Sequence, residues 1–332
     1  MKKGLSIAQR VALWDAALRA IRAHFHADGL REVLTPVRLS AVALEPFIEP
    51  MRAGGAGLLA TSPELPMKML LAGGSGSLFQ VAPCHRKGER GRLHAVGFHL
   101  VEWYREGDDG TLGRRDVEAI VASVFEVAGR PPPAAWEQHG MLDLIQATIG
   151  VSLRGSESAE ELATIVSARR PDLWTRPRGS DEETRTLAAW TGFYSNWSDA
   201  ALDPWLRSRA AVHVVDFPVA LAALADLGTP VRTQGRAGQL AHRCESFVHG
   251  IELANGYREL RDPAEQRRRF EVVARLREAH LQPALPMPEA FLAALERPGL
   301  PACAGTALGL ERLLMMATGS DAVRDIALTE RS

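Results

Sequence analysis

The chain has 332 residues, of which 46% are hydrophobic and 24% charged, and its formal net charge is −1. These proportions are those of a globular protein and exclude a disordered, collagen-like or coiled-coil chain. A net charge near zero also argues against a strongly basic nucleic-acid-binding protein. The three cysteines have no metal or disulfide spacing, and no apolar run approaches the ~20 residues of a membrane span. The sequence therefore predicts a cytoplasmic protein without a membrane partner.

The first predicted element is an amphipathic helix over residues 7–26. Apolar residues recur there at steps of three and four. Ser6 is a suitable N-cap and Gly29 a suitable stop signal. Residues 32–36 are expected to form a strand that Pro36 ends.

Two further strands are predicted at residues 78–86 and 97–104, after a glycine-rich loop at 50–60. A polar, basic loop at 87–92 separates these strands. A helix is expected next over residues 115–128, because apolar side chains return at helical spacing and a run of prolines follows.

The second half begins with a segment rich in tryptophan, residues 134–210, which we predict to be a helical insertion. Strands are expected at 211–217 and 247–257, where β-branched and aromatic residues are frequent. Asp262 is followed by proline and then an acid, which is the pattern of a helix start. A last helix is predicted over residues 308–318.

Residues 97–104 carry polar chemistry on one face of their predicted strand. Because side chains alternate along a strand, one face presents Phe98, Leu100, Glu102 and Tyr104. A ring, a carboxylate and a phenol on one face do not make a plain core face, and they can form a binding site. The alternative is an amphipathic hairpin whose polar side faces water.

A second group of polar residues lies in the predicted strand around residues 250–259. Glu252, Asn255 and Glu259 are separated there by apolar residues, and Asn255-Gly256 is also a turn signal. Partly buried carboxylates need a cation, which can be a metal ion, an ammonium group or an arginine. Structural pairing with the neighbouring Arg258 and Arg261 is the alternative.

The third group is the glycine-rich stretch 305–312. Small residues allow a backbone to approach a ligand closely, and a helix N-terminus favours an anion. Arg312 adds a positive charge there. The alternative is a glycine-rich helix entry that carries a surface arginine.

In this order, these segments resemble the three motifs of class II aminoacyl-tRNA synthetases. Thr35-Pro36 ends a segment like motif 1, Arg86 begins a strand–loop–strand like motif 2, and residues 309–312 resemble motif 3. Other segments resemble the lysine branch of that class: Thr61-Ser62-Pro63-Glu64, Met67-Lys68, Glu102-Trp103-Tyr104 and residues 250–259. The resemblance covers nearly the whole chain. Within the lysine branch, the chain is most similar to the stand-alone lysyl-tRNA synthetase-like proteins that act as elongation factor P β-lysine ligases.

This resemblance implies an α+β fold, a six- or seven-stranded antiparallel sheet flanked by helices, in one class II catalytic domain over residues 1–332. It implies a homodimer through the first helix and the motif 1 segment. The implied activity is ATP- and Mg²⁺-dependent adenylation of β-lysine or a lysine-like amino acid, followed by transfer to a lysine of elongation factor P. No anticodon-binding domain precedes the first helix, so charging of tRNA is the least expected activity.

The resemblance also assigns roles to individual residues. Arg86 and Arg312 would be catalytic and would hold the phosphates, and Glu252 would bind Mg²⁺. The ATP-binding set is Arg86, Glu89, His94, Phe98, Glu252 and Arg312, with the Phe98 ring stacked on adenine. The amino-acid-binding set is Ser62, Glu64, Glu102, Tyr104, Asn255, Glu259 and Ala307. Within it, Glu102, Tyr104 and Glu259 would bind the distal ammonium group, which needs several acceptors to offset its desolvation. The methyl group of Ala307, at a position that is smaller in the α-lysine enzymes, would distinguish β- from α-amino acids.

The sequence departs from the family pattern in motif 2. An acid two positions after the arginine contacts adenine in the family, whereas Gly88 stands here and Glu89 would substitute by a one-residue shift. A second acid, one position before Phe98, is replaced by Gly97, and Ala302 stands where an aspartate is usual. Two alternatives therefore stay open: the same adenylation chemistry with another acceptor, or a non-catalytic paralogue that binds an amino acid or a nucleotide and regulates a partner.

Overall fold

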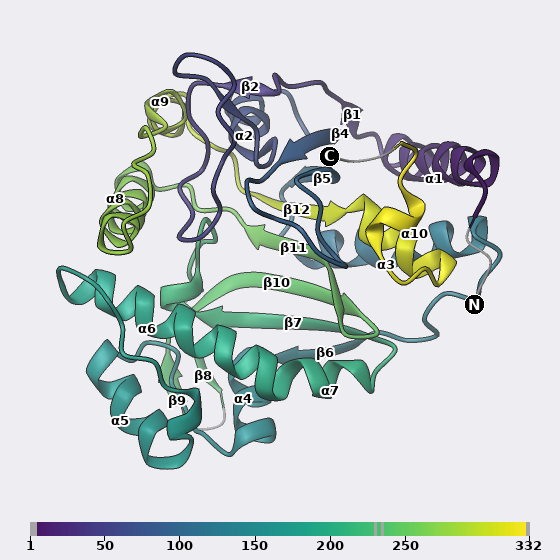
Figure 1. Ribbon diagram of the computed structural model, residues 1–332. Coiled ribbons are helices and arrows are strands. Elements are labelled where there is room, and N and C mark those ends of the chain that lie inside the picture. The colour runs from purple at the N-terminus through teal and green to yellow at the C-terminus, as the bar shows by residue number, and fades with distance from the viewer. Residues whose placement is uncertain (1–4, 229–230, 234–235, 330–332) are drawn as a thin grey trace.

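The computed structural model describes residues 5–228, 231–233 and 236–329. Its centre is an eight-stranded sheet (Figure 1). In sheet order its strands are β1 (Arg31–Glu32), β4 (Leu78–His85), β5 (Gly97–Glu106), β12 (Cys303–Gly309), β11 (Ile251–Arg258), β10 (Leu240–Val248), β7 (Ala211–Pro218) and β6 (Glu137–Gly140). Two small pairs lie outside it: β2 (Arg38–Leu39) with β3 (Leu58–Leu59), and β8 (Val231–Thr233) with β9 (Arg236–Gly238).

The six central strands of the sheet pair antiparallel, from β4 to β7. The predicted α+β fold with an antiparallel sheet is confirmed. The strand count differs, because the short edge strands β1 and β6 add parallel pairs with β4 and β7. The two strands of each parallel pair are separated by a long stretch of chain, so the local pattern of residues does not reveal their pairing.

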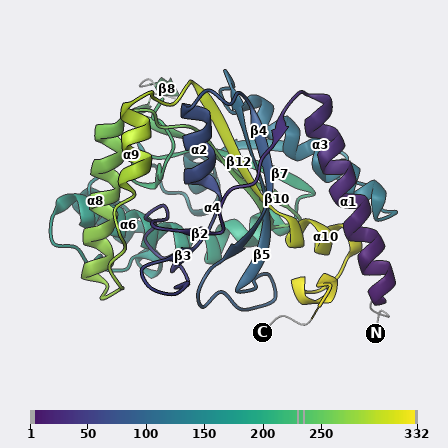
Figure 2. The same ribbon diagram turned by 90° about the horizontal axis from the view of Figure 1, so that it is seen from above.

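Helices cover both faces of the sheet (Figure 2). One face is covered by α1 (Ile7–Ala27), α3 (Thr111–Val127) and α10 (Leu310–Thr318). The other carries α2 (Glu64–Ala72), α8 (Pro263–Ala279) and α9 (Glu289–Glu296). Strand β5 shows the division, because Val101 and Trp103 pack in the first core whereas Tyr104 packs in the second. The predicted alternation along 97–104 is thus confirmed.

The segment between β6 and β7 is mainly helical. It contains α4 (Met141–Ile149), α5 (Ala159–Arg169), α6 (Glu182–Trp197) and α7 (Asp203–Arg207). Trp190, Phe193 and Trp197 of α6 are buried in a core that includes Val212 and Val214 of β7. Shorter helical turns lie at Pro171–Leu173, Ser198–Leu202, Val219–Leu221 and Val323–Ile326. In the described part of the chain, no helix has the length and apolar character that crossing a membrane requires.

Two predicted helix starts are confirmed in atomic detail. The hydroxyl of Ser6 accepts a hydrogen bond from the amide of Gln9, whose side chain accepts one from the Ser6 amide. Asp262 accepts hydrogen bonds from the amides of Ala264 and Glu265. These bonds satisfy amides that have no partner within the helix.

Three boundary predictions were wrong. The strand expected over 32–36 stops at Glu32, and the last helix begins at Leu310 because 303–309 is the strand β12. Residues 247–257 form parts of two antiparallel strands rather than one. The turn lies at His249 and Gly250, which both have positive φ, at 48° and 77°. That is the backbone shape of a tight hairpin turn, so the Asn255-Gly256 signal falls inside β11.

A β-bulge interrupts the pairing of β10 with β11. Ser246 pairs with Ala254, whereas the next residue, Phe247, pairs with Glu252, so Leu253 is left without a partner. Bulges of this kind re-aim side chains. Here the extra residue brings Glu252 onto the same face of the sheet as Asn255.

Candidate active site

A cavity of about 520 Å³ lies on one face of the sheet. Its floor is built by β5, β12, β11 and β10, four adjacent strands. Every residue that the sequence assigns to ATP or amino-acid binding lines this cavity: Ser62, Glu64, Arg86, Glu89, His94, Phe98, Glu102, Tyr104, Glu252, Asn255, Glu259, Ala307 and Arg312. The fold thus brings the predicted residues together from segments far apart in the chain.

One end of the cavity is formed by the buried carboxylate of Glu102. The hydroxyls of Ser62 and Tyr104 each donate a hydrogen bond to it, both at 2.7 Å. Burial, and then the charge of Glu64, raise the pKa of Glu102 to about 7 although the two hydroxyls act in the opposite direction. The group therefore gains or loses a proton near neutral pH and is suited to a cationic ligand.

Glu259 lies at the same end, with its side chain only 1% exposed. Its carboxylate is 2.5 Å from the ammonium of Lys68, and the same ammonium donates to Glu64 at 2.6 Å. Burial raises the pKa of Glu259 to about 8; Lys68 opposes this shift and Glu64 adds to it. The sequence assigned no role to Lys68, although it lies in a segment that carries the resemblance.

The floor between these carboxylates is shaped by residues with small side chains. A Cβ atom at Gly305 would collide with the ring of Tyr104 and the carboxylate of Glu259. Ala307 pairs with Glu102 on one side and with Asn255 on the other. Its methyl group therefore lies between the acid end of the cavity and the amide of Asn255.

Two arginines, Arg86 and Arg312, lie at the other end of the cavity. The Arg86 guanidinium lies 5.0 Å from the centre of the Phe98 ring and 3.6 Å from the carboxylate of Glu89. Its Nε donates to the carbonyl of Thr61 at 3.3 Å. These contacts hold a permanent positive charge beside an aromatic face, which suits an anionic ligand that carries a planar ring.

Arg312 is the second arginine at this end. It donates to the backbone carbonyl of Glu252 at 2.9 Å, and its Nη1 lies 3.3 Å from the carboxylate of the same residue. Its Nη2 lies 2.7 Å from Nε2 of His94. Burial, and then the charge of Arg312, lower the pKa of His94, so the neutral ring accepts this hydrogen bond.

Glu245 is a residue of the cavity that the sequence analysis missed. It pairs with Asn255 across β10 and β11, and its carboxylate accepts hydrogen bonds from Tyr194 and Arg243, both at 2.6 Å. Burial raises the pKa of Glu245; Arg243 opposes the shift, and Glu252 adds to it. The hairpin turn at residues 249–250 was the signal that could have revealed Glu245, because the position of that turn sets which residues of β10 and β11 pair with each other.

Comparison with known protein families agrees with this geometry. The model of class II tRNA synthetases (D, K and N) matches residues 5–329. The chain belongs to this class II synthetase family. The predicted family resemblance is thus confirmed.

Curated relatives give a finer comparison. A protein of Pectobacterium carotovorum subsp. carotovorum (strain PC1) named elongation factor P–(R)-β-lysine ligase is 33% identical over 93% of this chain and 91% of its own length. Proteins of the same name from Proteus mirabilis (strain HI4320) and Edwardsiella ictaluri (strain 93-146) are 33% and 32% identical. They cover 92% and 93% of this chain, and 90% and 91% of their own lengths.

Members of a class II synthetase family use ATP, and the cavity suits ATP with Mg²⁺. Glu252 and Glu245 offer the carboxylate oxygens that Mg²⁺ prefers, and 41% of the Glu252 side chain is exposed. Among the residues that the structure describes, none donates a hydrogen bond to the buried Oδ1 atom of Asn255. An acceptor of this kind requires a donor from a ligand or from water.

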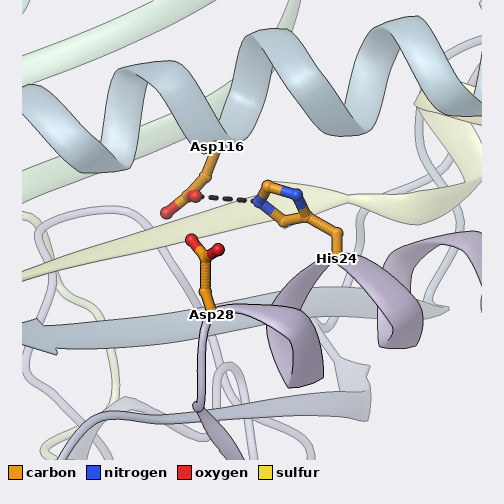
Figure 3. Close-up of side chains that lie close together, drawn as sticks. All are labelled: His24, Asp28 and Asp116. Atoms are coloured by element: carbon orange, nitrogen blue, oxygen red, sulfur yellow. Dashed lines mark hydrogen bonds and ion pairs between the residues drawn. The ribbon is translucent and has the colours of Figure 1, made fainter.

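A second cluster of potential metal ligands lies away from the class II cavity. His24, Asp28 and Asp116 come together between α1 and α3 (Figure 3). The guanidinium of Arg105 donates to both aspartates, at 2.6 to 2.7 Å, and His24 lies 2.9 Å from Asp116. Arg105 pairs with both carboxylates and His24 with one of them, so all three potential ligands already have partners within the protein, and we assign the cluster to structural ion pairing.

Proposed function

We propose that this protein is an ATP-dependent ligase that activates β-lysine or a lysine-like amino acid and transfers it to a lysine of elongation factor P. The observation that carries the proposal is one cavity with arginines at one end and buried carboxylates at the other. An ATP phosphate and an ammonium group would satisfy these two ends. The names of the relatives, at 33% identity over nearly the whole chain, support the amino acid and the acceptor.

The first step is adenylation of the amino acid. A carboxylate oxygen attacks the α-phosphorus of ATP, and the bond to pyrophosphate breaks. Arg86 and Arg312 stabilise the charge that develops on the phosphates, Phe98 stacks on adenine, and Glu89 and His94 complete that end. Glu252, with Glu245 beside it, would hold Mg²⁺, which supplies further charge neutralisation when bound. No nucleophilic side chain is needed, because positioning and electrostatics carry the step.

The amino acid is selected by its two ammonium groups. Glu102, Tyr104 and Glu259 bind the distal one, Ser62 holds Glu102 in place, and Glu64 faces the other. Asn255 lies beside the reacting carboxylate, and the methyl group of Ala307 favours a β-amino acid. Shortening that residue in Ala307→Gly should therefore move the preference toward α-lysine.

The second step transfers the acyl group to an amine. The ε-amine of an acceptor lysine attacks the acyl carbon, AMP leaves, and an amide bond forms. We propose that both steps take place in the cytoplasm, where ATP and translation factors are present.

The decisive experiment is pyrophosphate exchange with β-lysine, lysine, ornithine and norleucine. A site that pairs a buried acid with an ammonium should reject norleucine by about 10⁴-fold or more. Glu259→Lys should lose pyrophosphate exchange with every substrate that carries a second, terminal amine, and it should still bind ATP. Equal activity with norleucine would contradict the lysine-branch proposal, and no exchange with any amino acid would favour the non-catalytic alternative.

The acceptor needs its own test. Purified elongation factor P, its variant lacking the acceptor lysine, and an unrelated lysine-rich protein are incubated with enzyme, ATP and labelled β-lysine. Label on the first protein alone supports the proposal. Equal label on the unrelated protein would point to the same chemistry with another acceptor.

We also propose a homodimer. Ile7 and Val11 of α1 and Leu34 beyond β1 are apolar, yet they are 63%, 49% and 85% exposed. They belong to the helix and segment that resemble the motif 1 interface. Association of two copies would remove these side chains from water.

A further inference from the structure

Lys68 on α2 is a buried cation that the proposed reaction does not use. Its side chain is 2% exposed, and its ammonium lies 2.6 Å from Glu64 and 2.5 Å from Glu259. Those two acids line the cavity, whereas Lys68 does not. Lys68 thus lies outside the cavity lining and bridges the carboxylates of Glu64 and Glu259, which come from distant parts of the chain.

The choice of lysine at this position is unusual for this chain. Of 39 lysines and arginines only four are lysines: Lys2, Lys3, Lys68 and Lys87. A comparably buried cation elsewhere is an arginine, since Arg277 is 2% exposed and pairs with Glu49 at 2.6 Å. An ammonium is a compact point charge with three donors, whereas a guanidinium is planar and larger. The gap between Glu64 and Glu259 therefore holds a group of the same chemistry as the ligand proposed for the cavity.

The charges at this end can be counted. The carboxylates whose charges interact with Lys68 are those of Glu64, Glu102 and Glu259, and three carboxylates against one ammonium leave two negative charges when all are ionised. A diamino acid carries two ammonium groups. At a pH above the raised pKa values of Glu102 and Glu259, where all three acids are ionised, the count matches that substrate.

The remaining titratable groups that face Lys68 are neutral. Tyr104 of β5 has its ring centre 5.9 Å from the ammonium, and Cys303 of β12 lies near Glu259. Burial, and then neighbouring carboxylates, raise the pKa of both groups. Burial opposes the charge of Lys68, but Glu259 and Glu64 outweigh it and raise its pKa. Lys68 thus remains charged over the range in which Glu259, whose pKa is raised to about 8, gains or loses its proton.

We infer that Lys68 is a positioning residue that bridges Glu64 and Glu259, keeps them at fixed places and sets the charge of the pocket to the value that two substrate ammonium groups neutralise. The inference rests on the proposed function. It assigns a specificity role to a residue that touches neither ATP nor the amino acid.

The test compares the parent with Lys68→Met, which keeps the length of the side chain and removes its charge. The readout is the pH profile of kcat/KM for lysine and β-lysine in pyrophosphate exchange. Loss of an adjacent opposite charge raises a carboxyl pKa by about one to three units. The midpoint of the profile should therefore move up by at least about one pH unit, and kcat/KM at pH 7 should fall about tenfold or more. The KM for ATP should not change.

A charge-balanced variant serves as the control. Lys68→Met/Glu64→Gln removes one charge of each sign, so its midpoint should return toward the parental pH, and it leaves one unpaired buried carboxylate fewer than the single variant. Lys68→Arg keeps the charge and should also keep the midpoint while binding lysine more weakly. A Lys68→Met midpoint equal to the parental one, or a double variant shifted as far as Lys68→Met, would overturn the inference. Failure of the parent itself to activate any diamino acid would instead refute the proposed function.

Discussion

Arg312 donates a hydrogen bond to the backbone carbonyl of Glu252, and its guanidinium lies 3.3 Å from the carboxylate of the same residue. Arg312 belongs to α10, which follows β12, and Glu252 belongs to the neighbouring strand β11. The start of α10 therefore places the arginine proposed to bind phosphate beside the carboxylate proposed to bind the metal. Both groups act in the same step of the proposed reaction.

Removing either arginine of the cavity should greatly reduce adenylation and leave the fold intact. Arg312→Ala and Arg86→Ala each delete a charge-assisted contact to phosphate that is worth about 2–4 kcal/mol in a transition state. Pyrophosphate exchange should fall about 30- to 900-fold. Arg19→Ala, in an exposed ion pair of α1, is the matched control and should keep parental activity. Near-normal exchange by an Arg86 or Arg312 variant would contradict the motif assignment.

Gly305→Ala should close the amino-acid end of the cavity. The added methyl group meets the Tyr104 ring and the Glu259 carboxylate, and overpacking of this kind costs about 1–3 kcal/mol. We expect kcat/KM for lysine-type substrates to fall about tenfold to a hundredfold while calorimetry shows unchanged ATP affinity. Gly192→Ala on α6 is the control, because a methyl group there has open space. Equal effects of the two substitutions would argue against a tight fit at Gly305.

The amino-acid site should become more effective as pH rises through neutrality. Glu102 and Glu259 have pKa values raised to about 7 and about 8, and they bind an ammonium only when ionised. The value of kcat/KM for the amino acid should therefore rise between pH 6 and 8.5. A profile that is flat over this range would show that neither acid controls binding.

The same two acids make a prediction about stability. Their pKa values in the folded state lie above the ordinary value of 4.5, so the folded protein binds more protons than the unfolded chain. Their contribution to stability is present at low pH and is lost as pH rises through about 7 and 8. A bound diamino acid offsets this loss. The increase in melting temperature caused by lysine should thus be larger at pH 8.5 than at pH 6, as measured by thermal unfolding at both pH values.

The proposed homodimer can be tested at its exposed apolar face. Leu34→Glu places a charge on a side chain that is 85% exposed, so it should not harm the monomer but should disrupt association. Sedimentation at micromolar concentration should give a dimer for the parent and a monomer for this variant. Leu281→Glu is the control, since Leu281 is 91% exposed and lies beyond α8. A monomeric parent would refute the proposal.

Local patterns predicted a large part of this structure. The alternation along residues 97–104 placed Glu102 and Tyr104 on one face, and the cavity lies on that face. The caps at Ser6 and Asp262 depend on hydrogen bonds that span only two or three residues, so the sequence was sufficient to find them. The family motifs predicted the remaining residues that line the cavity, most of which lie on loops and helix starts.

Features that depend on contacts between distant segments were not predictable. The bulge at Leu253 is visible only once the register of β10 against β11 is known, and Glu245 enters the site through that register. The role of Lys68 depends on Glu259, which reaches it from the other end of the chain. The positive φ of His249 is uncommon for a residue with a side chain, so no turn was expected there.

The burial of Lys68 has a spectroscopic consequence. Its ammonium protons are held by two carboxylates and shielded from water, so they should exchange slowly with solvent. With four lysines in the chain, selective nitrogen-15 labelling of lysine gives a side-chain spectrum simple enough to assign by substitution. The resonance of Lys68 would then report directly, without any attached dye, when a ligand enters the cavity on the other side of Glu64 and Glu259.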